Sequence, residues 1–284
     1  SISVMMFGFN LQSVPLAIIG VSYASALFPS LSALFQKGDR DTFKKETWVA
    51  IRHIVLWTTL AVALMVVLRA HIVRVLLGTG AFTWNDTRLT AAVLAAFVIS
   101  LVAQSAMLIF SRAFYAAERQ REPILLNVGA AFLSSTVAYG AFTWFQQATT
   151  TRFFVEDLFR VGDIAGTEVV MVALSYSVVM LLAAVLFGFL FGKYFGYERG
   201  VVRSLFFSSA AAVLAGASTY VALQWFGPLL PTDTFLGIFA QGVAAAAVGG
   251  IMWIGVLYAM KSPEFSEIET VVARLIARHN PPSA

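Results

Sequence analysis

The sequence predicts an all-α membrane protein, a polytopic helical bundle with about seven transmembrane helices. Hydrophobic residues make up 59% of its 284 residues, charged residues only 12%, and the mean hydropathy is +0.82. This composition excludes an ordinary globular domain with a solvated surface. The long apolar runs are continuous, whereas a membrane barrel alternates over about ten residues. The chain has no cysteine, which excludes disulfides, thiolate catalysis and Cys-ligated metals.

Seven apolar stretches pass the length of about 20 residues that a helix needs to cross the hydrocarbon core. We expect spans over residues 11–34, 48–68, 90–111, 124–145, 169–192, 201–226 and 235–260. The chain opens at Ser1 without a basic signal region, so we expect a part of a longer protein. An odd number of spans places the two ends on opposite sides of the membrane.

Basic residues gather on one side of these spans. Of the 19 Lys and Arg, all but five fall in alternate connections that share one side with the C-terminus. Because basic residues prefer cytoplasmic loops, we expect a cytoplasmic C-terminus and an external N-terminus. The five on the other side are Arg69, Arg74, Arg88, Arg152 and Arg160.

Two connections and the tail have features of their own. Residues 69–89 begin as an amphipathic continuation and break at Gly78 and Gly80, which predicts a re-entrant or interfacial elbow. Residues 146–168 mix charges with aromatics, which predicts an external loop with a short surface helix. Residues 261–284 have helical amphipathic spacing, so we expect a helix on the inner membrane surface or packed on the cytoplasmic loops.

Small residues form stripes on the last two spans. Such residues, spaced four apart, let helix backbones approach closely. We therefore expect these two spans to pair. The stripes contain Ser208, Ala212, Gly216 and Tyr220 on the sixth span, and Gly242, Ala246 and Gly250 on the seventh.

The first span carries polar residues and two prolines. Asn10 and Gln12 precede Pro15, and Pro29 follows near the other end. A buried amide without a partner costs about several kcal/mol, so both amides must face another helix or water. Pro15 frees a carbonyl one turn earlier and permits a bend, and broken polar helices are typical of transporter cavities and gates. We expect Pro15 and Pro29 to shape gating.

Polar side chains also align on the third and fourth spans. Ser100, Gln104 and Ser111 share one face of the third, and Asn127 and Ser134 share one face of the fourth. Two interpretations stay open for them: bonds between helices, or the lining of a watery cavity. Of these, we assign Ser100 and Gln104 to the cavity together with Asn10 and Gln12.

Three motifs in order carry a family resemblance. The run VPLAIIGVSYASALFPSLSALFQKGD, the segment GTGAFTWNDT and the run SRAFYAAERQREP resemble the C-terminal half of the MurJ/MviN lipid II flippases. These belong to the multidrug/oligosaccharidyl-lipid/polysaccharide exporter superfamily. The match covers about residues 5–125. Its marker residues are Gly80, Phe82, Arg112, Phe114 and Tyr115.

The resemblance implies a parent with two six-helix lobes and two terminal helices. Residues 1–192 would be five spans of the C-terminal lobe, 193–260 the two additional helices, and 261–284 a cytoplasmic tail. The implied function is flipping of lipid-linked peptidoglycan precursor across the bacterial cytoplasmic membrane by alternating access. The last two helices would form a groove for the polyprenyl tail. The implied partners are the lipid-linked glycan, membrane lipids and the missing N-terminal lobe, with no cofactor, metal or nucleic acid.

One departure from the family pattern concerns charge. Where family members often carry an Asp-Arg pair and a Glu before this proline, the sequence has Phe9, Asn10 and Ser13, so Ser13 joins the predicted cavity residues. A guanidinium is the natural ligand of a diphosphate. Either the missing lobe supplies the cations or the substrate differs, for example another lipid-linked glycan or a drug. We find no catalytic cluster within the spans and expect no enzyme.

Overall fold

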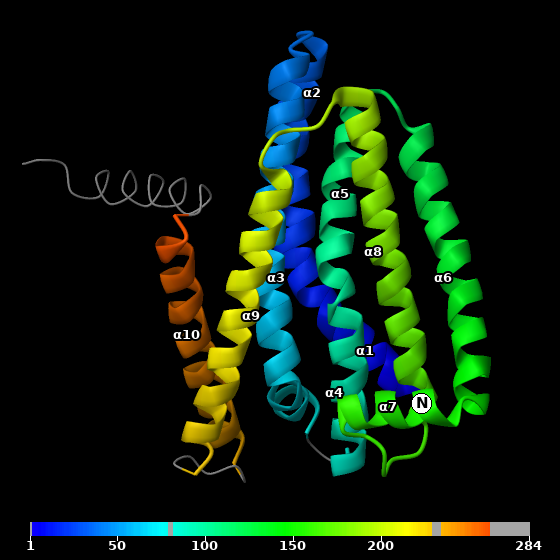
Figure 1. Ribbon diagram of the computed structural model, residues 1–284, viewed down its shortest axis with the longest axis vertical. Helices are drawn as coiled ribbons and strands as arrows, with labels where there is room; N and C mark the ends of the chain where they lie inside the picture. The colour runs from blue at the N-terminus through cyan, green and yellow to red at the C-terminus, as the bar shows by residue number, and fades with distance from the viewer. Residues whose placement is uncertain (1, 79–81, 229–233, 262–284) are drawn as a thin grey trace, which may run out of the picture.

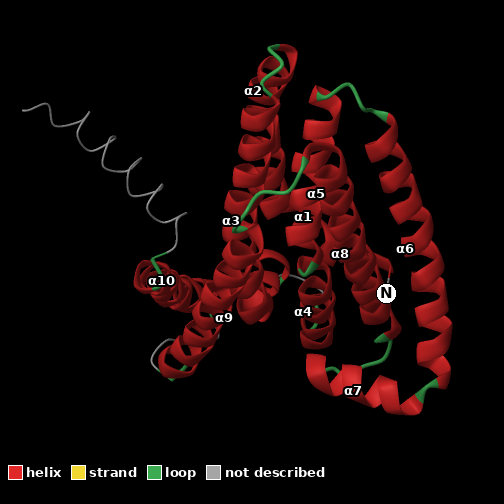
Figure 2. Cartoon of the chain, turned by 45° about the horizontal axis from the view of Figure 1, so that its top comes forward, coloured by secondary structure: helices red, strands yellow, loops and turns green. Residues whose placement is uncertain are grey.

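The computed structural model describes residues 2–78, 82–228 and 234–261, and every regular element within these ranges is a helix (Figures 1 and 2). Seven helical segments in these ranges are long and apolar enough to span a membrane, which confirms the predicted fold class. The predicted tail, residues 262–284, lies outside the described residues, as does Gly80. The helices are α1 (Ile2–Pro15), η1 (Leu16–Val21), α2 (Ser22–Gln36), α3 (Arg40–Leu77), α4 (Trp84–Val98), α5 (Ser100–Ala116), α6 (Arg121–Gln147), α7 (Thr149–Phe159), α8 (Glu168–Phe195), α9 (Val201–Phe226) and α10 (Phe235–Ala259).

The first span is irregular where the sequence predicts a bend. Directly after Pro15 the chain forms the π-helix η1, and α1 runs obliquely to α2 (Figure 1). Proline has no N–H to donate to the preceding turn, and a π-helical turn is one way to absorb that loss. Ser22 Oγ donates to the carbonyl of Ala17 at 3.2 Å, five residues back, and so supports the wider turn. In contrast, α2 continues through Pro29 without interruption.

The segment of residues 69–89 begins as the predicted helical continuation and breaks at Gly78, also as predicted. Its first part, up to Leu77, continues α3 as one helix of 38 residues. At 1.5 Å per residue this helix is about 57 Å long, well beyond the hydrocarbon thickness of about 30 Å. The chain resumes at α4, whose start is fixed by a capping box between Thr83 and Asp86. Residues 69–77 are therefore not a re-entrant segment, because the α3 hydrogen-bond ladder simply continues.

The third span, α4 followed by α5, lies at the centre of the bundle. Most of its apolar window is buried, 78%, against 6% for α6. Rings from α3, α5 and α8 meet at one end of it, for example Phe110 and Phe191 with centroids 5.5 Å apart. Because lipid tails are as apolar as these side chains, close packing rather than the hydrophobic effect holds such helices together. Most of the large residues on α6 instead face outward, as expected for a lipid-facing helix, whereas Phe145 near its end is buried.

The predicted surface helix of the 146–168 connection is confirmed as α7. This helix lies across the lower end of the bundle (Figures 1 and 2). It ends at Arg160, which has left-handed backbone with φ 57°. Arg88 of α4 donates to both carboxylate oxygens of Asp163 at 2.7 and 2.6 Å, and also to the Arg160 carbonyl. These bonds attach the connection after α7 to α4.

Helices α9 and α10 pack against each other at one side of the molecule, as expected, but the predicted stripes are not the contact. A Cβ at Gly249 would overlap the Thr219 side chain and lie 3.1 Å from the Ala215 carbonyl oxygen. Gly216 and Gly242 face α3 instead, and Gly250 has open space beside it. The predicted contact between the two stripes is therefore wrong. Their glycines Gly216 and Gly242 lie against α3, and α9 and α10 meet through other small residues such as Gly249.

Candidate substrate cavity

A cavity of about 480 Å³ lies where the first span, α5, α6 and α8 meet. Its polar lining comes mainly from α5, which contributes Gln104, Ser111, Arg112 and Tyr115. The π-helix η1 forms another wall, so the irregular turn after Pro15 lies beside the cavity. The remaining lining residues are Leu16, Val21, Met107, Leu108, Asn127, Tyr176 and Met180.

Arg112 gives the cavity a cation. Its guanidinium carbon lies 5.7 Å from the centroid of the Phe28 ring in α2, and no described carboxylate forms an ion pair with it. Ser111, Tyr115 and Asn127 lie in the same lining, and each can donate a hydrogen bond. A guanidinium with neutral donors around it and no bound carboxylate can bind an anion, with phosphate groups as the best geometric match.

The predicted cavity residues separate into two groups. Gln104 Nε2 lies 2.7 Å from Ser100 Oγ and 3.5 Å from Gln12 Oε1, so these three side chains come together. Gln12 and Ser100 are fully buried, and only Gln104 of the three also lines the cavity. Gln12 thus contacts α5 rather than solvent, which corrects the expectation that its amide faces a solvated headgroup.

Asn10 lies on another side of α1. Asn10 is exposed, and its backbone carbonyl oxygen accepts a hydrogen bond from Ser13 Oγ at 2.7 Å. Residues two apart on an α-helix point about 200° apart, so Asn10 and Gln12 cannot face the same space. Neither Asn10 nor Ser13 lines the cavity. Their roles remain predictions.

The family-marker residues also differ in position. Arg112 and Tyr115 line the cavity, whereas Phe114 is fully buried in the aromatic packing with Phe187 and Phe191. Phe82 contacts Phe7 of α1 edge to face at 6.2 Å. Arg112 was predicted only as a family-marker residue, although its position eight residues after Gln104 places both residues on one helical face.

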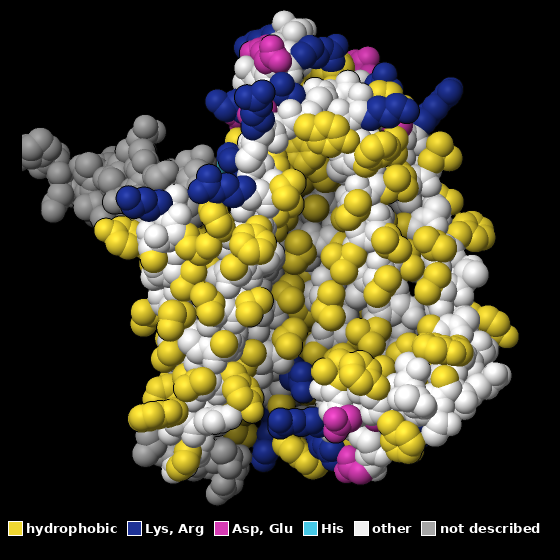
Figure 3. Space-filling model, in the orientation of Figure 1, with side chains coloured by type: hydrophobic (Ala, Val, Ile, Leu, Met, Phe, Trp, Pro, Cys, Tyr) yellow, Lys and Arg dark blue, Asp and Glu magenta, His cyan; other side chains and the backbone are white. Residues whose placement is uncertain are grey.

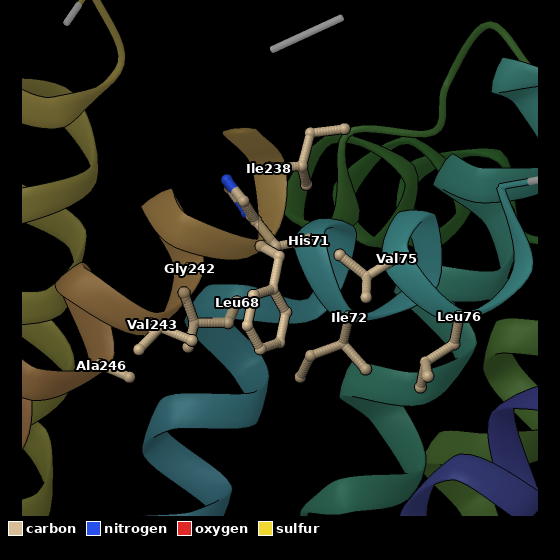
Figure 4. Close-up of a pocket in the computed structure, with 10 residues that line it drawn as sticks. Leu68, His71, Ile72, Val75, Leu76, Ile238, Gly242, Val243 and Ala246 are labelled. Carbon is tan, nitrogen blue, oxygen red and sulfur yellow. The ribbon is translucent and has the colours of Figure 1, made fainter. Parts of the chain in front are cut away.

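A second hollow, about 290 Å³ and almost wholly apolar, lies between α3 and α10. Figure 4 shows Leu68, Ile72 and Val75 of α3 facing Val243 and Ala246 of α10. A neighbouring hollow of about 560 Å³ lies between α3 and α9. Helices α10 and α9 thus each form one wall of an apolar hollow whose other wall is α3. That these helices hold a polyprenyl tail remains a prediction.

A membrane bundle with a broken, polar first span beside a cavity has the features typical of transporters. The sequence profile of the family described as Lipid II flippase MurJ matches residues 1–240, and the chain belongs to this family. The family is one of transporters rather than of catalysts.

Known relatives match the same region at low identity. A protein from Bdellovibrio bacteriovorus named probable lipid II flippase MurJ is 25% identical over 272 residues, which cover 94% of this chain and 47% of that protein. A protein of the same name from Rickettsia prowazekii is 26% identical over 137 residues, 48% of this chain and 27% of that protein. The chain thus spans at most about half the length of these relatives.

A solved structure has the same fold. The structure titled Lipid II flippase MurJ, inward closed conformation, superposes with a TM-score of 0.63 at 18% identity, over 91% of this chain and 48% of that one. Both comparisons leave about half of the longer protein unmatched, as the resemblance to a C-terminal half implies.

Proposed function

We propose that this chain is the C-terminal half of a flippase that moves lipid-linked peptidoglycan precursor, lipid II, from the inner to the outer leaflet by alternating access. Membership of the family and the names of the relatives support this substrate. The partial coverage of those relatives supports an N-terminal lobe as the partner with which the cavity is completed.

The single observation that carries the proposal is Arg112 in the central cavity. A lipid-linked precursor has a diphosphate between its isoprenoid and its sugar, and this diphosphate must cross the hydrocarbon core. Arg112 supplies a permanent positive charge for it, with neutral donors from Ser111, Tyr115 and Asn127 around that charge. The chain lacks the family's Asp-Arg pair before Pro15, so Arg112 is the cation that this lobe offers to the diphosphate.

The irregular first span provides a way to change the cavity. Single π-helical turns within α-helices are frequent at functional sites. In this scheme α1 and α2 reorient about η1, while the contact of Gln12 with Gln104 holds α1 to α5 in one of the states. Because Pro15 has no N–H to donate, we expect the turn to stay irregular during this movement.

The apolar hollows beside α3 would hold the isoprenoid tail during the same movement. Their linings are almost free of polar surface, and their walls include residues of α9 and α10. In the membrane, we place the C-terminus in the cytoplasm and the chain in the bacterial cytoplasmic membrane, on the evidence of the unequal distribution of Lys and Arg. We assign no catalytic step to the chain.

Another exporter of lipid-linked glycans is the second candidate, because the cation of Arg112 recognises the diphosphate and not the sugar. Antiport of a drug against a cation is disfavoured, because no carboxylate is among the residues that line the cavity.

Complementation tests the proposed substrate. The full-length protein is expressed in bacteria depleted of their own lipid II flippase, and lipid II at the outer surface is measured with an impermeant enzyme that cleaves it. We expect externally cleaved lipid II to return with the wild type and not with Arg112→Gln. Rescue of another exported glycan lipid, with no lipid II outside, would assign the chain to the second candidate.

A further inference from the structure

A basic cavity lies at the end of the molecule away from the α2–α3 connection. Its volume is about 500 Å³, and its walls come from α3, α4, the end of α7 and α9. Three arginines line it, Arg69, Arg88 and Arg160. Figure 3 shows Lys and Arg side chains gathered in the furrow between α9 and α7 near the lower end of the molecule.

Among the described residues, a carboxylate partner is present for only one of these three arginines. Arg88 binds Asp163 through two hydrogen bonds. Arg69 is partly buried and forms no hydrogen bond or ion pair with any described residue, and the charge of Arg160 acts on it repulsively. No described carboxylate forms an ion pair with Arg160 either. Two like charges therefore face one cavity without a counter-charge from this part of the chain, an arrangement that an anion stabilises.

The Arg160 backbone is fixed in position. Its carbonyl accepts a bond from Arg88, and its left-handed conformation ends α7 at this residue. The hydrogen bond from Arg88 to the Arg160 carbonyl thus fixes the backbone from which the Arg160 side chain extends at the edge of the cavity.

Apart from the arginines and His71, the lining consists of aliphatic and aromatic residues, which favours an amphipathic ligand. Val66, Val67 and Phe159 form part of the wall. Val66, Val67 and Tyr220 also line the apolar hollow between α3 and α9, so the basic cavity and this hollow adjoin. A soluble anion would gain nothing from this hollow, whereas a lipid can place its phosphate at the arginines and a chain along the apolar wall.

We propose that this cavity binds the phosphate group of an anionic membrane lipid between Arg69 and Arg160, separately from the central cavity at Arg112. A phosphate accepts charge-assisted hydrogen bonds from both guanidinium groups. By the distribution of basic residues this end faces the outer leaflet, so the lipid would come from that leaflet. The site does not depend on which substrate the protein transports.

The test is lipid retention by the full-length protein, measured by native mass spectrometry after incubation with phosphatidylglycerol or phosphatidylcholine. Charge-assisted hydrogen bonds contribute enough for loss of one arginine to weaken binding about tenfold. We expect retained phosphatidylglycerol in the wild type and a decrease of about that size in Arg69→Gln and in Arg160→Gln. Arg121→Gln, an exposed arginine of α6, is the matched control and should retain the lipid.

Melting without added lipid separates binding from folding. Because Arg69 and Arg160 repel each other, neither substitution should lower the melting temperature of the lipid-free protein. Equal retention of phosphatidylglycerol by all variants, or of phosphatidylcholine by the wild type, would overturn the proposal. Displacement of the lipid by inorganic diphosphate at low concentration would also overturn it, since the site would then belong to a soluble anion.

Discussion

Gln12 of α1 and Gln104 of α5 meet beside the central cavity, with Gln104 Nε2 3.5 Å from Gln12 Oε1. This distance is at the long limit for a hydrogen bond, whereas Gln104 also binds Ser100 Oγ at 2.7 Å. Gln12 Nε2 is buried without a described partner. The polar contact between α1 and α5 is therefore incompletely satisfied at this point, which is compatible with the proposed reorientation of α1 about η1.

Asn10 and Gln12 lie on opposite sides of α1, one exposed and one buried, so the same substitution should affect them differently. Asn10→Arg should accumulate in the membrane nearly as the wild type does, because Asn10 is exposed. Gln12→Arg should fail to accumulate, because an unpaired guanidinium at a fully buried site costs about 3–5 kcal/mol. Membrane yield and melting of the two full-length variants are the measurements. Equal loss of both would show that Asn10 is also buried in the assembled protein.

The two neighbouring glycines of α10 test the α9–α10 contact. Gly249→Leu should lower the melting temperature, since its side chain meets Thr219 and Ala215, and overpacking costs about 1–3 kcal/mol. Gly250→Leu gains the same helix propensity but enters open space. Thermal melting of both variants is the check. A melting temperature for Gly249→Leu at or above that of Gly250→Leu would contradict the packing described.

The Arg88–Asp163 pair predicts a dependence on pH. The hydrogen bonds from Arg88 hold the pKa of Asp163 below its ordinary value. A carboxyl group with a lowered pKa stabilises the fold above its unfolded pKa of about 3.9, and this contribution is lost as the pH falls through the folded pKa. Asp163→Asn should therefore melt below the wild type at neutral pH, and the difference should shrink below about pH 4.

Asp157→Asn, in the same connection, is the control for this comparison. Melting curves of the three proteins from pH 7 to pH 3 are the measurement. If the difference between Asp163→Asn and the wild type stays constant with pH, ionisation of Asp163 is not what stabilises the connection to α4.

Topology can be tested in the cysteine-free chain. Gly162→Cys should react with an impermeant thiol reagent added to intact cells, and Arg199→Cys should react only after the cells are opened. Both positions are exposed, so protein burial does not limit labelling. Labelling of Arg199→Cys alone in intact cells would reverse the orientation.

The spans, the irregular turn after Pro15 and the surface helix α7 could be predicted because composition, proline chemistry and charge decide them locally. The direction in which individual side chains point could not be predicted. The sequence pairs Asn10 with Gln12 as polar neighbours, but the helical rotation between them separates them. Likewise, Gly216 and Gly242 each lie in a row of small residues typical of helix contacts. The sequence does not say whether α9 and α10 contact each other through these rows or contact α3.

The position of Arg112 on the cavity face of α5 could have been predicted from the sequence. Gln104, Leu108 and Arg112 are four apart in turn, and all three line the cavity. The sequence does not reveal that η1 and α8 lie around this face of α5 and enclose a cavity there. The apolar hollows beside α3 could not be predicted for the same reason. They depend on how closely α3 packs against α9 and α10, which is decided by the tertiary structure.

Transport by Arg112 variants tests the central claim most directly. The full-length protein is reconstituted in liposomes, and the rate at which lipid II reaches the opposite leaflet is measured for the wild type, Arg112→Gln and Arg121→Gln. Loss of a charge-assisted contact to the diphosphate should slow Arg112→Gln at least about tenfold, with melting unchanged and Arg121→Gln at the wild-type rate. A wild-type rate for folded Arg112→Gln would contradict the assignment of this cavity to the lipid-linked diphosphate.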